Sequence, residues 1–112
     1  MWPLRTVLGA GVLALGLAAG FAAAQDAEFR IVIKDHKFVP AEVTVPAGKK
    51  IKLVVENQDA TAEEFESYEL NREKVVPAKG QITVFVGPLA PGRYPFFGDF
   101  HMDTARGVLI AK

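Results

Sequence analysis

Four residues that could bind a metal ion lie close together near the end of the sequence, in the stretch PFFGDFHMDTARG. They are Asp99, His101, Met102 and Asp103. A neutral imidazole is the commonest protein ligand for a metal, carboxylates bind harder ions, and a thioether suits Cu(I). In an ordinary turn the same aspartates would face solvent and the histidine would be packed or exposed. The stretch therefore predicts either a metal-binding loop or a plain turn between two strands.

The rest of the sequence narrows the chemistry that such a loop can carry. There is no cysteine, so thiolate nucleophiles, iron–sulfur clusters and thiolate-bound copper are excluded. Ser67 is the only serine and has no nucleophile-elbow context, and no glycine-rich phosphate loop is present. His36, in KDHKF, is the only other histidine. We expect it at the end of a strand, either as a ligand or as a structural residue.

Alternation of apolar and polar residues predicts the strands that position the loop. In KKIKLVVEN, for example, Ile51, Leu53 and Val55 share one face, as expected for a half-buried strand. The turn-forming stretches VPAG, ENQD, PAKG and APG separate the strands. So many turns in a short chain predict an all-β sandwich or barrel. The predicted strands are residues 29–34, 42–46, 49–57, 81–87, 92–98 and 107–112.

Residues 59–77 depart from this alternation and contain many acids. They are expected to form an irregular excursion with one helical turn at TAEEF and a short strand near EKVV. Long irregular loops on compact β-domains often carry function. Glu66 and Tyr68 in this excursion are therefore candidate ligands as well. The alternatives are a solvated acid and a tyrosine that packs its ring and hydrogen-bonds its hydroxyl.

The first 24 residues differ from the rest of the chain. An apolar stretch rich in Ala, Leu and Gly follows MWPLR and ends in AAA, the small-residue pattern of a secretory cleavage site. We expect a signal peptide at residues 1–24 and one exported domain at residues 25–112, located in the periplasm. An uncleaved membrane anchor is the alternative, because the apolar run approaches the roughly 20 residues that span a bilayer.

The charges argue against nucleic acid as a partner. Thirteen Lys and Arg residues balance 13 Asp and Glu residues, and no basic run occurs. Contact with a membrane is expected only through a partner protein or an uncleaved signal.

The segments FVPAEVTVPAGKKIKLVVENQD and LAPGRYPFFGDFHMDTARGVLIAK together resemble the cupredoxins, the small blue-copper proteins and their relatives. The resemblance spans the exported domain and implies a Greek-key β-sandwich or barrel. It also implies the place of a metal site, in the loop before the last strand. Gly98 stands where that family has its thiolate cysteine, and His101 stands where it has the following histidine. The methionine ligand of the family falls near Ala105 or Arg106, so Met102 does not match it by position.

The first histidine ligand of the cupredoxins has no counterpart in residues 57–77, and Glu66 or Tyr68 lies about where it would fall. A blue-copper site is therefore excluded. Any metal would be bound through nitrogen and oxygen atoms, with Met102 as an optional sulfur ligand. Asp99 and Asp103 would act as ligands or as partners that orient the imidazole.

A narrower resemblance joins EEFESYELNREKVVP to FFGDFHMDTARG. Together they are similar to cysteine-less, cupredoxin-like periplasmic proteins of bacterial iron-uptake systems. This similarity implies a copper or iron ion as the cofactor, and it implies a membrane iron permease and a periplasmic iron-binding protein as partners. It places a mononuclear site at His101 with Glu66 from the opposing loop. The implied role is electron transfer or, at most, a ferroxidase-type accessory activity. The subgroup commonly has a histidine where this chain has Tyr68.

Two other functions stay open at the level of sequence. The chain could be a metal-free β-sandwich that docks on a membrane transporter through EEFES and LNREK. It could instead be a Cu(I) carrier that uses His101 and Met102.

Overall fold

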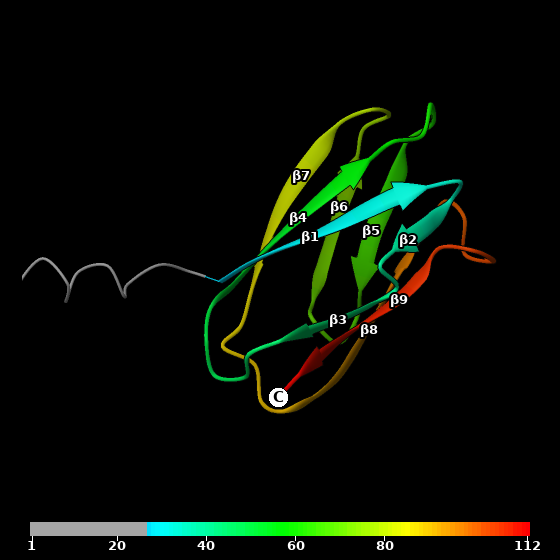
Figure 1. Ribbon diagram of the computed structural model, residues 1–112. Helices are drawn as coiled ribbons and strands as arrows, with labels where there is room; N and C mark the ends of the chain where they lie inside the picture. Colours follow the sequence, from blue (N-terminus) through cyan, green and yellow to red (C-terminus); the bar gives the residue numbers. More distant parts are fainter. Residues whose placement is uncertain (1–26) are drawn as a thin grey trace, which may run out of the picture.

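Nine strands form two mixed sheets in the computed structural model, which describes residues 27–112 (Figure 1). The predicted signal peptide at residues 1–24 lies outside the described residues. No helix of the described part is long and apolar enough to cross a membrane. The strands are β1 (Ala27–Lys34), β2 (Lys37–Val39), β3 (Glu42–Val45), β4 (Ile51–Asn57), β5 (Glu63–Ser67), β6 (Arg72–Val76), β7 (Gln81–Val86), β8 (Gly92–Gly98) and β9 (Arg106–Ala111).

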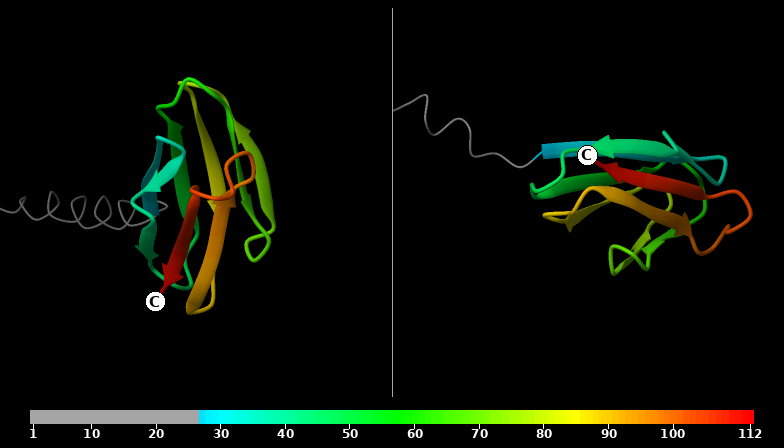
Figure 2. Two further views of the ribbon diagram at one scale, coloured as in Figure 1. Left: turned by 90° about the vertical axis from the view of Figure 1, so that its right-hand side faces the viewer. Right: turned by 90° about the horizontal axis from the view of Figure 1, so that it is seen from below.

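The order of the strands places the predicted metal loop at one end of a sandwich. One sheet has the order β2-β1-β4-β7 and the other has the order β3-β9-β8-β5-β6. β1 runs parallel to β4, and β3 runs parallel to β9, so both sheets are mixed. The two layers are visible in Figure 2, where the loop between β8 and β9 projects from one end. The predicted all-β sandwich is confirmed, and within the described residues its strands do not close into a barrel.

An aromatic cluster fills the core between the two sheets. Phe38 of β2 meets Phe65 of β5 and Phe96 of β8 edge-on, with ring centroids 6.1 Å and 5.0 Å apart. Phe65 and Phe96 lie 5.2 Å apart, and all three side chains are buried. Such edge-on pairs add to the stabilisation that comes from burying the rings. This cluster joins the two sheets next to the end where the β8–β9 loop lies.

The segment between residues 59 and 77 is a β-hairpin and not an irregular excursion. The strand near EKVV is confirmed as β6, but no residue of the described chain is helical, and TAEEF leads into β5 instead. Alternation is present in β5, where residues 63, 65 and 67 are buried and the two between them are half-buried. Because Glu63 and Ser67 are polar, only Phe65 marks the buried face in the sequence.

We expect Phe96→Ala to lower the free energy of unfolding by about 3–5 kcal/mol, because the substitution leaves a cavity against Phe38 and Phe65. Phe85→Ala on β7 is the matched control. Phe85 is 44% exposed and lies beneath the ammonium group of Lys50. Its loss should change stability by no more than about 1 kcal/mol. Equal losses for the two variants in urea titrations would show that the aromatic cluster does not stabilise the core.

Candidate metal centre

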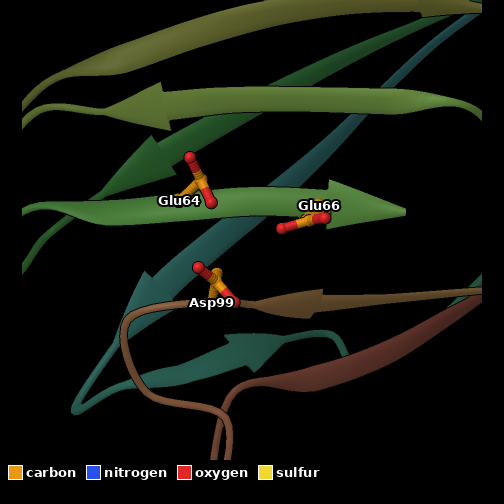
Figure 3. Close-up of side chains that lie close together, drawn as sticks. All are labelled: Glu64, Glu66 and Asp99. Carbon is orange, nitrogen blue, oxygen red and sulfur yellow. The ribbon is translucent and has the colours of Figure 1, made fainter. Parts of the chain in front are cut away.

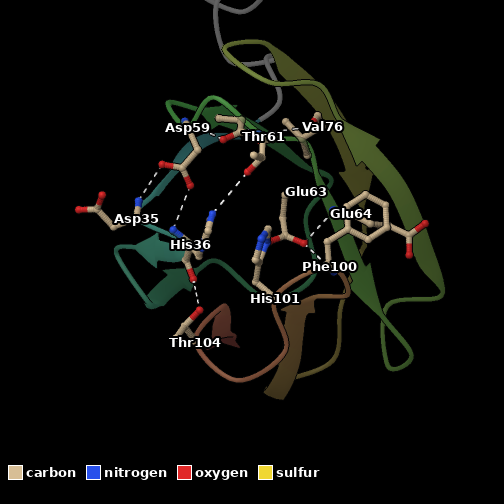
Figure 4. Close-up of polar contacts among 11 residues, drawn as sticks. Asp35, His36, Asp59, Thr61, Glu63, Glu64, Val76, Phe100, His101 and Thr104 are labelled. Carbon is tan, nitrogen blue, oxygen red and sulfur yellow. Dashed lines mark hydrogen bonds and ion pairs between the residues drawn. The ribbon is translucent and has the colours of Figure 1, made fainter.

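Three connections meet at the end of the sandwich that holds the β8–β9 loop: the β1–β2 turn, the β4–β5 connection and the β8–β9 loop itself (Figure 4). The hydroxyl of Thr104 donates to the backbone carbonyl of His36 at 2.6 Å, which ties the β8–β9 loop to the β1–β2 turn. The carboxylate of Asp59 accepts hydrogen bonds from the backbone amides of Asp35 and His36. The fold therefore brings His36 and His101, which are 65 residues apart in the sequence, to one place.

The imidazole of His101 contacts a buried glutamate, Glu63. Its Nδ1 lies 2.6 Å from Oε2 of Glu63, and the side chain of Glu63 is only 1% exposed. The other carboxylate oxygen of Glu63 accepts from the backbone amides of Glu64 at 2.9 Å and Phe100 at 2.8 Å. An ionised carboxylate can only accept, so in the neutral imidazole of His101 Nδ1 carries the proton and Nε2 is the nitrogen that can bind a metal. Metal-binding histidines are commonly oriented by a carboxylate in this way.

The second histidine lies face to face with the first. The rings of His36 and His101 have centroids 3.6 Å apart and an angle of 13° between their planes. Nε2 of His36 is 3.4 Å from the hydroxyl of Thr61 on the β4–β5 connection. The two imidazole rings therefore lie together at one surface position.

A surface pocket opens beside the histidine pair. Both histidines line it, together with Asp99, Phe100, Met102, Asp103 and Thr104. Met102 is 42% exposed, and its backbone carbonyl accepts a hydrogen bond from Nε of Arg106. Asp103 is exposed as well. The structure thus places His36, His101, Met102, Asp99 and Asp103 around one pocket.

Glu66, another predicted ligand, lies in a cluster of acids on the outer face of the five-stranded sheet (Figure 3). Glu64, Glu66 and Asp99 each offer an oxygen atom, and these three oxygens lie within 4.8 Å of one another. Glu73 of β6 stands directly opposite Glu66. Partial burial, and then the negative charges of Glu73 and Asp99, raise the pKa of both Glu64 and Glu66 above the usual value. This acidic cluster attracts cations to the surface next to the pocket.

The predicted pairing of Glu66 with His101 is not present. Side chains alternate between the two faces of a strand, so Glu66 and Glu63 point to opposite sides of β5. The inward residue, Glu63, contacts His101, whereas Glu66 faces outward with Glu64. Tyr68 does not line the pocket of the histidines: it packs its ring 5.4 Å from that of Phe97 and lines a separate pocket with Glu66.

Sequence reasoning missed Glu63 because a buried glutamate looks like one more acid in an acidic segment. The position of Phe65 in the sequence could have indicated that Glu63 is buried. A phenylalanine on an isolated apolar position of a strand fixes the buried face, so residues 63 and 65 share that face. A carboxylate on the buried face needs donors, and the loop before β9 supplies them from His101 and Phe100.

Gly98, at the end of β8, has no room for a side chain. A Cβ atom at this position would lie 2.5 Å from the carboxyl carbon of Glu63 and 2.7 Å from Cβ of Ala105. The carboxylate of Glu63 therefore occupies the space into which a larger residue at position 98 would project.

Comparison with known proteins agrees with this fold. A family model described as a cupredoxin-like domain matches residues 7–111. An uncharacterised protein of Rickettsia prowazekii is 54% identical over 85 residues, which cover 76% of this chain and 68% of that protein.

Two solved structures have a similar fold. The metal-binding domain of the Cu(I)-exporting P-type ATPase of Streptococcus pneumoniae, solved with Cu(I), has a TM-score of 0.68 at 15% identity, covering 76% of this chain and 84% of that one. Auracyanin A, a blue copper protein of Chloroflexus aurantiacus, has a TM-score of 0.68 at 14% identity, covering 79% and 100%. The fold is thus related to copper-binding proteins.

The residues of this chain do not fit a blue-copper centre. Position 98, where the cupredoxin pattern places the thiolate, is a glycine, and Glu63 and Ala105 fill the space beside it. Ala105 is fully buried and offers no ligand atom. The potential ligand atoms that line the pocket are the imidazole nitrogens of His36 and His101 and the carboxylates of Asp99 and Asp103, which are nitrogen and oxygen donors.

We expect Gly98→Ala to lower the free energy of unfolding by about 1–3 kcal/mol, because the new methyl group collides with Glu63. In a Glu63→Ala background the same substitution should cost less, since the carboxylate is no longer there. A double-mutant cycle measured by urea unfolding gives the coupling between the two positions. Equal costs in both backgrounds would mean that Glu63 does not fill this space.

Glu66→Gln is expected to raise the melting temperature at neutral pH, measured with a chelator present. The pKa of Glu66 is raised in the folded state, so its contribution to stability is present below the ordinary value of 4.5 and is lost as the pH rises through the folded-state value. Below 4.5 the variant and the wild type should melt together. Glu42→Gln, an exposed glutamate on β3, is the control and should change nothing. A melting temperature of Glu66→Gln below that of the wild type at neutral pH would contradict a destabilising environment for the charged Glu66 beside Glu73 and Asp99.

Proposed function

Since the chain belongs to the cupredoxin-like domain family, we propose that it is a metal-binding protein that holds a copper or iron ion at the β8–β9 loop. The single observation that supports this most strongly is the bond between the buried carboxylate of Glu63 and Nδ1 of His101. A buried carboxylate is costly unless it is paired. Here it keeps the ring in one orientation and one tautomer, with Nε2 free.

In this proposal His101 supplies the first ligand through Nε2, and His36 supplies the second when its ring turns out of the stack so that a ring nitrogen points at the same ion. The carboxylates of Asp99 and Asp103 and the thioether of Met102 line the same pocket and are available to the ion. A bound copper or iron ion would supply Lewis-acid or one-electron chemistry. The ligands are loop residues at the surface, which suits an ion that is taken up and passed on.

We further propose that the protein works in the periplasm as an accessory to iron transport. It would serve a membrane iron permease together with a periplasmic iron-binding protein, either by holding the ion or through electron transfer or ferrous oxidation. The support comes from the similarity of EEFESYELNREKVVP and FFGDFHMDTARG to iron-uptake proteins, and from the acidic cluster beside the pocket. An adjacent iron permease gene would favour this role, whereas a copper-resistance cluster would favour Cu(I) carriage through His101 and Met102.

Isothermal titration with Cu(II), Cu(I) and Fe(II) tests the site. The wild type should bind at least one of these ions. Glu63→Gln should weaken binding by about 10–100-fold, the range for partners that orient a ligand, and His101→Ala should weaken it more. Met102→Leu should lower affinity for Cu(I) selectively if the thioether takes part.

Two controls make the titration decisive. Glu42→Gln removes a distant carboxylate and should bind like the wild type. Glu66→Gln removes a carboxylate of the acidic cluster and should have a smaller effect than His101→Ala. Absence of binding by the wild type, or undiminished binding by His101→Ala, would overturn the proposed site.

A second function, docking without metal, is favoured by one observation. Tyr68 exposes 74% of its surface beside the acidic residues Glu66 and Glu73, in a shallow pocket that Arg72 also lines. An exposed aromatic side chain among charges is typical of a protein-recognition surface. Capture of the permease that survives His101→Ala and fails with Glu66→Lys would support docking over metal binding.

A further inference from the structure

The β1–β2 turn carries a histidine at a position that favours glycine. Lys34 pairs with Lys37, so the hairpin has a two-residue turn made of Asp35 and His36. Both residues are in the left-handed region, with φ of 53° and 58°. Turns of this kind prefer Asn or Asp followed by Gly, because a side chain is strained there. Strain of this kind persists where the surroundings hold it in place, and it gathers at functional sites.

Two side chains hold this turn: Thr104 through the carbonyl of His36, and Asp59, on the β4–β5 connection, through both backbone amides (Figure 4). The two carboxylate oxygens of Asp59 accept hydrogen bonds from the backbone amides of Asp35 at 2.8 Å and His36 at 2.9 Å. Partial burial acts to raise the pKa of Asp59, but these two amide bonds and the charges of His36 and Lys79 outweigh it, so the pKa is lowered. Asp59 is therefore the ionised partner of both strained residues.

Asp59 is itself fixed to the core of the domain. Its backbone amide donates to the side-chain oxygen of Asn57, which is buried. The side-chain nitrogen of Asn57 donates in turn to the carbonyls of Thr61 and Val76. The carbonyl of Asp59 accepts from the amide of Lys79. The position of Asp59 is thus set by β4, β6, the β4–β5 connection and the β6–β7 turn, and not by the turn that it holds.

From these contacts we propose that Asp59 is a positioning residue of the metal site: it fixes the β1–β2 turn so that the ring of His36 lies over the ring of His101. The 3.6 Å stack of the two imidazoles is the result of this contact. A glycine at position 36 would relieve the strain of the turn but would bring no nitrogen ligand to the pocket. The positioning of His36 by Asp59 does not depend on the proposed function. Only its expected effect on metal affinity rests on that function.

The positioning can be tested on the metal-free protein. Ring stacking shifts the NMR resonances of the imidazole protons, so His36→Ala gives the reference shift of an unstacked His101. Asp59→Ala should move the ring protons of His101 most of the way to that reference. Asp35→Asn is the matched control, because it removes a carboxylate from the same turn and keeps a residue that tolerates the left-handed conformation. It should leave the shifts of His101 at their wild-type values.

The consequence for binding is tested by a double-mutant cycle in Cu(II) titration. Asp59→Ala should lower the affinity about tenfold, the lower end of the range for partners that orient a ligand. In a His36→Ala background it should have no further effect, because Asp59 acts through that ring. Asp35→Asn should bind like the wild type.

The outcomes separate this inference from the proposed function. Wild-type protein that binds no Cu(II), Cu(I) or Fe(II) overturns the proposed function, while the NMR shifts of Asp59→Ala still decide whether Asp59 positions His36. Unchanged shifts in Asp59→Ala overturn the inference even if the wild type binds Cu(II). A full tenfold loss from Asp59→Ala in the His36→Ala background also overturns it, because Asp59 would then act by another route.

Discussion

The end of the sandwich that carries the site depends on one buried carboxylate. Glu63 lies beneath the β8–β9 loop and accepts hydrogen bonds from His101 and from two backbone amides, those of Glu64 and Phe100. Its burial would be costly without these donors. With them, Glu63 holds β5 to the loop, orients the imidazole and occupies the space next to Gly98. A single side chain therefore determines both the shape of the loop and the ligand that it presents.

The alternation of β5 explains why the site has two chemically different parts. Glu63 and Phe65 point into the sandwich, while Glu64 and Glu66 point outward. The inner part contains the two imidazoles. The buried carboxylate of Glu63 bonds the ring of His101, and the carboxylate of Asp59 bonds the backbone amide of His36. The outer part contains like charges that repel one another, and partial burial together with this repulsion raises the pKa of Glu64 and Glu66. The loop after β8 joins the parts, since Asp99 belongs to the acidic cluster and His101 lies two residues further on.

Most strands could be predicted because their burial follows apolar alternation. β4, with Ile51, Leu53 and Val55 buried, is a clear case. Prediction failed where polar residues occupy buried positions, as in β5, or where the strand is too short for alternation to appear, as in β2. At the site, the sequence indicated His101 and the residues around it, but it offered Glu66 as the partner in place of Glu63. Polar burial depends on donors supplied from distant parts of the chain, which no local pattern reveals.

The sequence by itself determined the all-β class, the cupredoxin-like frame, and the absence of any thiolate ligand, because periodicity, turn residues and composition are local properties. Only the tertiary structure decided which residues meet. It stacked His36 on His101 across 65 positions of sequence, and it turned Glu63 inward and Glu66 outward. Pairing of strands and packing of two sheets fix these contacts, since each depends on register and on the face of a strand that the opposite sheet covers.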